Sequence, residues 1–372
     1  MKLPSQHWKE GQLQDLVFFQ RGFDITQAQQ SPGPYAVISS SGITSYHNEF
    51  KAHGPGVVIG RKGTLGSIHF SESDYWPHDT TLWSRDLRGN NARFVYYYLH
   101  TLNLKRFDVG NSNPTLNRNH IHDLPVRIPP MAVQDSIAAI LSVYDTLVEN
   151  NQRRMALLEE AARQLYREWF VRLRFPGHDH TRIINGLPEE WERGTLGDLA
   201  EITMGQSPES KHYNEDGEGL PFHQGVTDFG DRFVTHRVYS NALNRLAEPG
   251  DILCSVRAPV GRLNVTLDKI VIGRGLAALR SKTGNQSLLL QQLRAHFFKE
   301  DLIGGGAIFA SVTKKEFSAQ KLLKPADRLR RAFEDVTIPC DEQIRILHLQ
   351  NQQLRAARDL LLPLLMSGQI AV

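Results

Sequence analysis

Two loops combine basic residues with glycine or proline in a way that suits contacts to phosphate groups. The first is Arg61-Lys62-Gly63-Thr64 and the second is Arg257-Ala258-Pro259. Where glycine removes side-chain bulk, backbone N–H groups and Arg or Lys side chains can approach phosphate oxygens closely. These loops therefore favour contacts to the phosphates of a nucleic acid.

A second pair of basic segments, Thr115-Leu116-Asn117-Arg118 and Val312-Thr313-Lys314-Lys315, introduces two hydrophobic-patterned stretches. In isolation such segments are typical of helix caps followed by solvated basic residues. Because both kinds of segment occur twice in the chain, we favour a binding function over the capping alternative. The predicted DNA-contacting residues are Arg61, Lys62, Thr64, Arg118, Arg257, Lys314 and Lys315.

The sequence lacks the motifs of enzymes that modify or cut DNA. It has no Gly-rich loop for a methionine-derived methyl donor, and no Asn or Asp followed by Pro-Pro and an aromatic residue. Glu49-x-Lys51 and Glu209-x-Lys211 have part of a nuclease spacing, but they lack a convincing upstream Asp and stand at non-equivalent points. His178 and His180 have no further Cys or His at ligand spacing. We therefore predict no catalytic residue, no metal site and no cofactor bound by this chain.

The composition is that of a soluble globular protein. The 372 residues are 40% hydrophobic and 22% charged, and 43 Lys and Arg against 40 Asp and Glu give a net charge of +3. We find no run of the ~18 to 20 apolar residues that a membrane helix requires. The polar N-terminus MKLPSQHWKEG and the presence of only two cysteines, Cys254 and Cys340, favour a reducing compartment. We expect a cytoplasmic protein with no membrane partner.

The basic loops belong to an internal repeat. Leu3-Pro4 precedes a series of six residues that returns after Leu187-Pro188, and the six matches hold one offset of 183 residues. The two series are Trp8, Gly11, Leu13, Asp15, Leu16 and Gly22, and Trp191, Gly194, Leu196, Asp198, Leu199 and Gly205. A shared register of this length predicts a duplicated domain.

Each copy closes on a proline four residues before a glutamine, Pro130 before Gln134 and Pro339 before Gln343. A helical pattern begins at each glutamine. In this interpretation residues 324 to 338 are an insertion in the second copy.

A heptad pattern follows the first copy. From Gln134 to Phe175 no Pro or Gly interrupts a seam whose positions alternate by four and three residues, which predicts a helix about 55 to 60 Å long. The seam consists of Ile137, Leu141, Tyr144, Val148, Asn151, Met155, Leu158, Ala162, Leu165 and Trp169. The tail offers a partner seam at Leu347, Gln350, Leu354, Ala357, Leu361 and Leu364.

Chain order predicts that the two helices are antiparallel, because the first leads away from the first domain and the tail returns. Asn151 at a seam position either fixes the register or is solvated where the helices splay. The main predicted seam contacts are Leu141, Val148, Asn151, Leu158, Leu165, Leu354 and Leu361.

The predicted fold is α+β, with two similar mixed α/β domains separated by a long antiparallel two-helix coiled coil in a pseudo-two-fold arrangement. The predicted segments are a first domain at 1–133, a central coiled-coil helix at 134–175, a linker at 176–186, a second domain at 187–341 and a C-terminal coiled-coil helix at 342–372. The first domain has 13 basic and 10 acidic residues, and the second has 20 and 21. Tight DNA binding would therefore need additional positive surface from a partner.

With these features the chain resembles the specificity (S) subunits of Type I restriction-modification systems. The resemblance rests on the repeated Leu-Pro-Trp-Gly-Leu-Asp-Leu series, the loop from Gly60 to Gly66, the Pro-Pro-x-x-x-Gln exit, the heptad helix and the tail 358–368. It covers essentially the whole chain. The resemblance implies that the two domains are target-recognition domains, each reading one half of a bipartite site in double-stranded DNA.

The resemblance also implies the partners. The helices would bind two modification (methyltransferase) subunits, which bring S-adenosylmethionine, and restriction (motor-nuclease) subunits that use ATP and Mg²⁺. Two alternatives from other classes are a coiled-coil scaffold with duplicated protein-binding domains and a stand-alone DNA-modifying enzyme. The missing methyltransferase motifs disfavour the enzyme.

Overall fold

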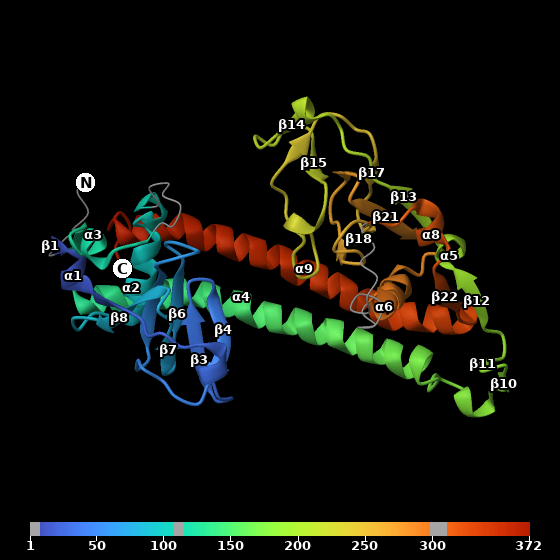
Figure 1. Ribbon diagram of the computed structural model, residues 1–372, viewed down its shortest axis with the longest axis horizontal. Coiled ribbons are helices and arrows are strands. Elements are labelled where there is room, and N and C mark those ends of the chain that lie inside the picture. The colour runs from blue at the N-terminus through green and yellow to red at the C-terminus, as the bar shows by residue number, and fades with distance from the viewer. Residues whose placement is uncertain (1–7, 108–114, 298–310) are drawn as a thin grey trace. The chain divides into compact units, whose positions relative to one another are not determined.

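The computed structural model describes residues 8–107, 115–297 and 311–372 (Figure 1). Leu3-Pro4, at the predicted start of the repeat, lies outside these residues. The chain divides into two compact units, Met1–Gln152 with His348–Val372, and Arg153–Leu347.

The first copy is built from short strands and helices. Its elements are β1 (Lys9–Gln12), α1 (Leu13–Leu16), β2 (Phe18–Arg21), η1 (Gln27–Gln29), β3 (Tyr35–Ser39), β4 (Gly42–His47), β5 (Gly56–Gly60), β6 (Ile68–Ser71), β7 (Tyr75–Pro77), β8 (Thr81–Asp86), α2 (Ala92–His100), η2 (Leu104–Phe107), α3 (Arg118–His122) and β9 (Pro125–Ile128). One sheet has the order β2-β8-β5-β6, a second has the order β4-β3-β7 with β3 parallel to β7, and β1 pairs with β9.

Residue types explain the central elements of this copy. β5 carries Val57-Val58-Ile59 between two glycines, and all five of its residues are buried, as expected for a short apolar run covered on both faces. α2 begins after Asn91, whose side chain accepts a hydrogen bond from Phe94 N. Phe94 then packs in one core with Ile137 of the following long helix.

The second copy has a matching set of elements. They are β12 (Glu192–Thr195), α5 (Leu196–Leu199), β13 (Ala200–Met204), η5 (Ser210–His212), β14 (Tyr213–Asn214), β15 (Leu220–His223), η6 (Val226–Asp228), β16 (Tyr239–Ser240), β17 (Leu246–Ala247), β18 (Ile252–Ser255), β19 (Leu263–Val265), β20 (Ile270–Ile272), β21 (Leu276–Ser281), α6 (Gln286–Phe297), α8 (Lys314–Ser318) and β22 (Lys321–Lys324). Its sheets are β13-β21-β18-β19 and β14-β16-β15-β20-β17, and β12 pairs with β22.

The two copies share the connectivity of their central elements, which confirms the predicted duplication, although the second sheet has three strands in the first copy and five in the second. The sheet β2-β8-β5-β6 has the same connectivity as β13-β21-β18-β19, and in each copy the second sheet contains a parallel pair, β3 with β7 and β15 with β20. The predicted α+β class with two similar domains is therefore correct.

Two long helices follow the copies. α4 (Met131–Tyr166) continues into the π-helical segment η3 (Arg167–Val171), and α9 (Asp327–Met366) closes the chain (Figure 1). Between α4 and the second copy lie η4 (His178–His180) and a small pair of strands, β10 (Ile183–Ile184) and β11 (Leu187–Pro188).

The helices run antiparallel within each unit, as predicted. In the first unit Leu141 shares a core with Leu365, while Asn151, further along α4, is hydrogen-bonded to Asn351, which lies earlier in α9. In the second unit Leu158 packs against the core that contains Ile344, while Tyr166, further along α4, meets Phe333, which lies earlier in α9, edge to face with ring centroids 6.5 Å apart.

The predicted end of the second copy is wrong. α9 begins at Asp327 and not at 342, so residues 324–338 are not an insertion, and Pro339 lies inside the helix. The true exit is Pro325-Ala326: Ala326 O accepts bonds from Leu329 N and Arg330 N, as Pro130 O does from Val133 N and Gln134 N.

A proline removes one helical hydrogen bond, but tertiary packing keeps α9 continuous here. Phe333 and Ile344, on either side of Pro339, are both fully buried. The first helix also differs from its predicted bounds of 134–175. It begins at Met131, and its α-helical part ends at Tyr166.

The predicted seam residues of α4 are buried or partly buried, whereas every second seam position of α9 lies one residue later than predicted. Leu141, Val148 and Asn151 are buried, and Leu158, Leu165, Leu354 and Leu361 are partly buried. Gln350 is exposed, and the buried position is Asn351.

One helix among the described residues, Met131–Val171, is long and apolar enough to cross a membrane by length and composition alone. Its seam residues Ile137 and Leu141 are fully buried in the core of the first unit. The helix also carries exposed apolar residues, such as Val143, which contribute to its high mean hydropathy.

Candidate nucleic-acid interface

Three segments meet along one edge of the first copy: the loop after β5 (61–66), the connection between β7 and β8 (78–80) and the stretch leading into α3 (115–118). Arg61 N and Lys62 N donate to Thr80 O over 2.8 and 3.1 Å. On the other side, Leu116 N donates to Arg61 O over 2.9 Å. We call this arrangement the three-segment edge.

The second copy has the same three-segment edge, formed by residues 256–261, 273–275 and 311–315. Val256 N donates to Gly275 O over 2.9 Å, and Val312 N donates to Val256 O over 2.9 Å. These bonds match those of Arg61 and Leu116. Lys62 therefore corresponds to Arg257.

A tight turn shapes the first segment of each edge. Gly66 N donates to Gly60 O over 2.8 Å, and Gly261 N donates to Ser255 O over 2.9 Å. Gly66 and Gly261 have φ values of +73° and +85°, which side chains other than glycine rarely adopt. A Cβ at Gly66 would also lie only 3.0 Å from Lys105 N. The glycines are thus required by the turn.

The third segment of each edge caps a short helix. The Asn117 side chain accepts a bond from Asn119 N at the start of α3, and Thr313 forms a capping box with Glu316 at the start of α8. Arg118 therefore corresponds to Lys314, and Lys315 corresponds to the uncharged Asn119. The capping alternative describes this geometry correctly, and the basic residues of both caps remain exposed.

The predicted DNA-contacting residues differ in how free their side chains are. Thr64, Arg118, Arg257, Lys314 and Lys315 are exposed. Lys62 is half-buried, and the Arg118 guanidinium lies over the Phe18 ring at 5.9 Å.

Arg61 is half-buried as well, and its Nη1 atom has no hydrogen-bond partner within the described ranges. Burial lowers the pKa of Arg61, and the positive charge of the neighbouring Arg21 lowers it further. The negative charge of Asp79 acts in the opposite direction. Because Arg61 corresponds to Val256, this charge belongs to the first copy alone.

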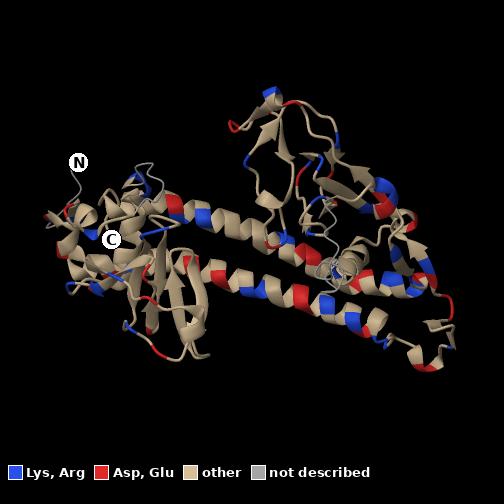
Figure 2. Ribbon diagram, viewed as in Figure 1, with Lys and Arg blue, Asp and Glu red and all other residues tan. Residues whose placement is uncertain are grey.

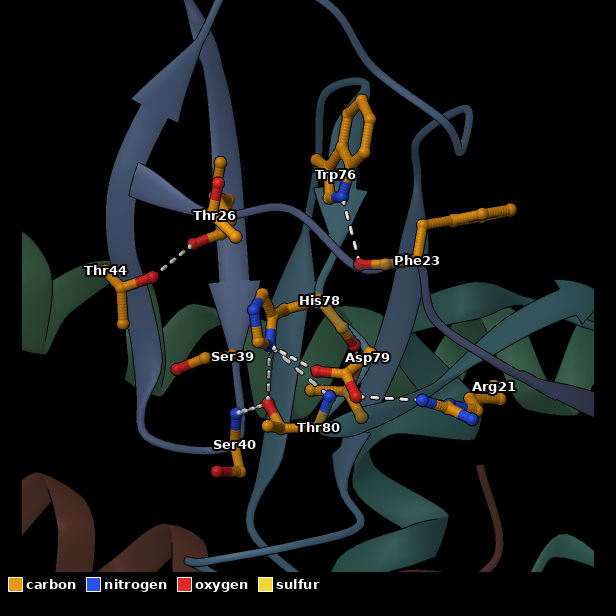
Figure 3. A network of polar contacts seen from close by, with 12 residues as sticks. Arg21, Phe23, Thr26, Ser39, Ser40, Thr44, Trp76, His78, Asp79 and Thr80 are labelled. Carbon is orange, nitrogen blue, oxygen red and sulfur yellow. Dashed lines mark hydrogen bonds and ion pairs between the residues drawn. The ribbon is translucent and has the colours of Figure 1, made fainter. Parts of the chain in front are cut away.

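A polar network that the sequence did not reveal adjoins the edge of the first copy (Figure 3). Arg21 Nη2 donates to Asp79 Oδ2 over 2.9 Å, and His78 Nδ1 lies 3.1 Å from Asp79 Oδ1. His78 Nδ1 is also 3.0 Å from Thr80 Oγ1, which accepts a bond from Ser40 N over 3.3 Å. The network therefore holds the 78–80 connection in one conformation.

Ligand atoms of Asp24, His78 and Asp79 lie within 4.8 Å of one another, a separation that a metal ion could bridge. The Asp79 carboxylate, however, is already bound to Arg21. The nuclease-like pairs contain exposed ion pairs, Lys51 with Glu49 and Lys211 with Glu209, and neither belongs to a three-segment edge.

Charge is mixed over the molecule (Figure 2). Lys and Arg alternate with Asp and Glu along both α4 and α9.

Comparisons with known proteins agree with this architecture. The sequence pattern of the family described as the Type I restriction modification DNA specificity domain matches residues 5–160 and 188–327. A chain of Methanocaldococcus jannaschii described as the type I restriction enzyme MjaX specificity subunit is 31% identical over 301 residues, which are 77% of this chain and 71% of that one. The MjaIX specificity subunit of the same organism is 22% identical over 302 residues, which are 76% of this chain and 69% of that one.

The fold is also that of a solved structure. The S subunit of a Type I restriction-modification system from M. genitalium aligns with a TM-score of 0.62 and 16% identity, covering 98% of each chain. Fold and edges together define a duplicated α+β protein whose two copies alternate with two long helices. The chain belongs to the Type I restriction-modification DNA specificity family.

Proposed function

We propose that this protein is the DNA-recognition subunit of a Type I restriction-modification complex, and that each copy reads one half of a bipartite site in double-stranded DNA. The observation that carries this is the recurrence of the three-segment edge. In both copies it presents a basic residue at the tight turn, Lys62 or Arg257, and another at the cap, Arg118 or Lys314. Phosphates are the same in every half-site, so residues that contact them should keep their charge between copies.

A domain exchange tests this division of the site. Residues 1–130 are replaced by the equivalent domain of a relative, and the methylation sites of the assembled complex are mapped on genomic DNA. Only one half of the recognised sequence should change, because each copy carries its own edge. A change in both halves together would contradict independent reading.

The helices are the proposed docking surface for two modification subunits. On the outer face of α4, Ile140, Val143 and Leu147 are 36%, 56% and 43% exposed at helical spacing. An exposed apolar stripe of this kind is typical of a protein-binding surface. These partners would supply S-adenosylmethionine and additional positive surface for DNA binding, and restriction subunits would use ATP and Mg²⁺.

The docking proposal is tested by co-purification with the modification subunits. The double variant Val143→Glu, Leu147→Glu should abolish the complex, since two charges would be desolvated in the interface. Thr146→Glu places a charge at another exposed position of the same helix and should leave the complex intact. Equal retention of both variants would contradict docking on this face.

We propose a non-catalytic role for the chain, which binds no cofactor of its own and acts in the cytoplasm, where it meets the cell's DNA. Purified alone, it should neither methylate nor cleave DNA, whether S-adenosylmethionine, ATP or Mg²⁺ is supplied. Methyl transfer by the lone chain would favour the stand-alone enzyme. Failure of the assembled complex to bind DNA would favour the scaffold with duplicated protein-binding domains.

A further inference from the structure

The connection between β7 and β8 in the first copy matches the connection between β20 and β21 in the second. His78 N donates to Ile38 O over 2.9 Å, and Gly273 N donates to His223 O over 2.8 Å. At the other end, the bonds from Thr81 N to His78 O and from Leu276 N to Gly273 O are both 3.0 Å long. His78-Asp79-Thr80 and Gly273-Arg274-Gly275 therefore follow the same backbone path, and Asp79 corresponds to Arg274.

The charge at this position is reversed between the copies although the backbone is the same. Arg274 is exposed, and within the described ranges its guanidinium makes no hydrogen bond or ion pair. The side chain of Asp79 is 19% exposed, and Arg21 donates a hydrogen bond to its carboxylate (Figure 3). Lys62 and Arg257, which also flank the connection, keep the same sign.

A position that contacts phosphate should stay positive in both copies, because phosphate is negative in every sequence. A position that reads a base is free to reverse its charge, because base edges carry both donors and acceptors. In the major groove a carboxylate accepts a hydrogen bond from the N4 amino group of cytosine, and an arginine donates two bonds to O6 and N7 of guanine.

The surroundings of Asp79 also suit it to a place beside DNA. Arg21 binds the carboxylate, and the Arg61 guanidinium is close enough for Asp79 to affect its pKa. The two guanidinium groups offset the repulsion between the carboxylate and nearby phosphates. The carboxylate keeps free lone pairs for a base, since a carboxylate offers about four acceptor sites.

We propose that Asp79 and Arg274 are equivalent specificity-determining residues, Asp79 accepting a hydrogen bond from a cytosine in one half-site and Arg274 donating to a guanine in the other. This inference rests on the proposed function, because it assigns side chains to the DNA reading that the three-segment edges perform.

The test uses the complete complex with modification subunits. The wild-type site is first mapped by methylation, and competition binding is then measured with duplexes in which each base pair is changed in turn. Asp79→Ala should reduce discrimination at one C·G pair of one half-site by roughly 10-fold or more and leave the other half unchanged. Arg274→Ala should do the same at one G·C pair of the opposite half.

Matched controls separate base reading from charge and from loop structure. Glu49→Ala and Arg193→Ala remove exposed charges of the same sign from the same copies and should leave the preference unchanged. Asp79→Asn keeps the size of the side chain and should move the preference at the same base pair toward adenine, whose N6 and N7 atoms asparagine binds. A purely structural role predicts instead a uniform loss of binding with an unchanged sequence preference.

The outcomes are distinguishable from failure of the proposed function. A wild-type complex with no sequence preference would overturn the proposed function itself. Suppose instead that the wild-type complex is specific. If Asp79→Ala and Arg274→Ala leave its sequence preference unchanged, or if either variant abolishes the preference in both half-sites, only the assignment of these two residues is overturned.

Discussion

Asn151 and Asn351 face each other across the two long helices, with Asn151 Nδ2 donating to Asn351 Oδ1 over 2.9 Å. The two residues are 8% and 3% exposed, and Asn351 Nδ2 also lies 3.4 Å from Val148 O. A buried amide pair in an otherwise apolar seam satisfies its polar atoms in one register only. Asn151 is therefore not solvated between splayed helices, and its geometry fits a residue that fixes the register of the two helices.

Replacing only one asparagine of this pair should lower the free energy of unfolding more than replacing both. Asn151→Leu leaves the Asn351 Oδ1 atom buried without its donor, which should cost about 1 to 3 kcal/mol of unfolding free energy. Asn151→Leu with Asn351→Leu removes both polar groups and should recover most of that loss. Denaturant unfolding of the single and double variants measures the difference. Additive losses in the double variant would contradict a coupled pair.

Two neighbouring leucines of α4 provide a matched test of the seam. Leu158 is partly buried and packs against the core that contains Ile344, whereas Leu157 is 64% exposed. Leu158→Asp should lower the melting temperature clearly, because an unpaired charge enters the seam at a cost of roughly 3 kcal/mol or more. Leu157→Asp should change it little. Similar melting curves for both variants would count against the seam assignment.

Lys62 and Arg257 should act on DNA binding without affecting sequence preference. Either residue changed to Ala should weaken binding of the assembled complex to all sequences alike, and should make the dependence of log Kd on log salt shallower by about one. Lys9→Ala removes an exposed positive charge from β1 and serves as the control. A changed base preference in the Lys62 variant would mean that Lys62 reads a base.

His223 should make the second unit sensitive to acid. Its side chain is fully buried with Nε2 3.0 Å from Nδ1 of His236, and burial, followed by the His236 charge, lowers its pKa to about 4. Between pH 6.5 and 4 the unfolded chain therefore takes up a proton that the folded chain does not, so stability falls as the pH falls. From pH 7.5 to 5 the loss should be about 2 kcal/mol.

Denaturant unfolding at the two pH values checks this expectation. His223→Gln should reduce the difference between them, and His53→Gln, at a side chain 82% exposed, should not. An equal difference in wild type and His223→Gln would exclude this histidine as the source.

The duplication and the α4 seam could be predicted because each is visible in the sequence without knowledge of any contact in the folded chain. Matching residues such as Trp8 and Trp191 keep one offset, and a heptad needs only its own helix to be visible. The seam of α9 could not be fixed in this way. Leu364 and Leu365 fit the pattern equally well, and the observed register buries Asn351 against Asn151 and pairs Arg358 with Asp145. That choice is made by the partner helix.

The sequence predicts the exit of the second copy at the wrong place because Pro339 has the character of a helix boundary. Only the packing of Phe333 shows that the helix has already begun. At the candidate site, the sequence is enough to predict the basic loops, because Lys62 and Arg257 are both basic. The equivalence of Asp79 and Arg274 is not visible in the sequence because their side chains differ, and it follows only from the shared backbone hydrogen bonds.

The pairing of β1 with β9, and of β12 with β22, has a consequence for how such a protein evolves. In each copy the first and last strands are hydrogen-bonded neighbours, so the chain enters and leaves the domain at adjacent points. A domain of different loops or length can therefore take the place of either copy without moving the two points at which the chain joins the rest of the molecule.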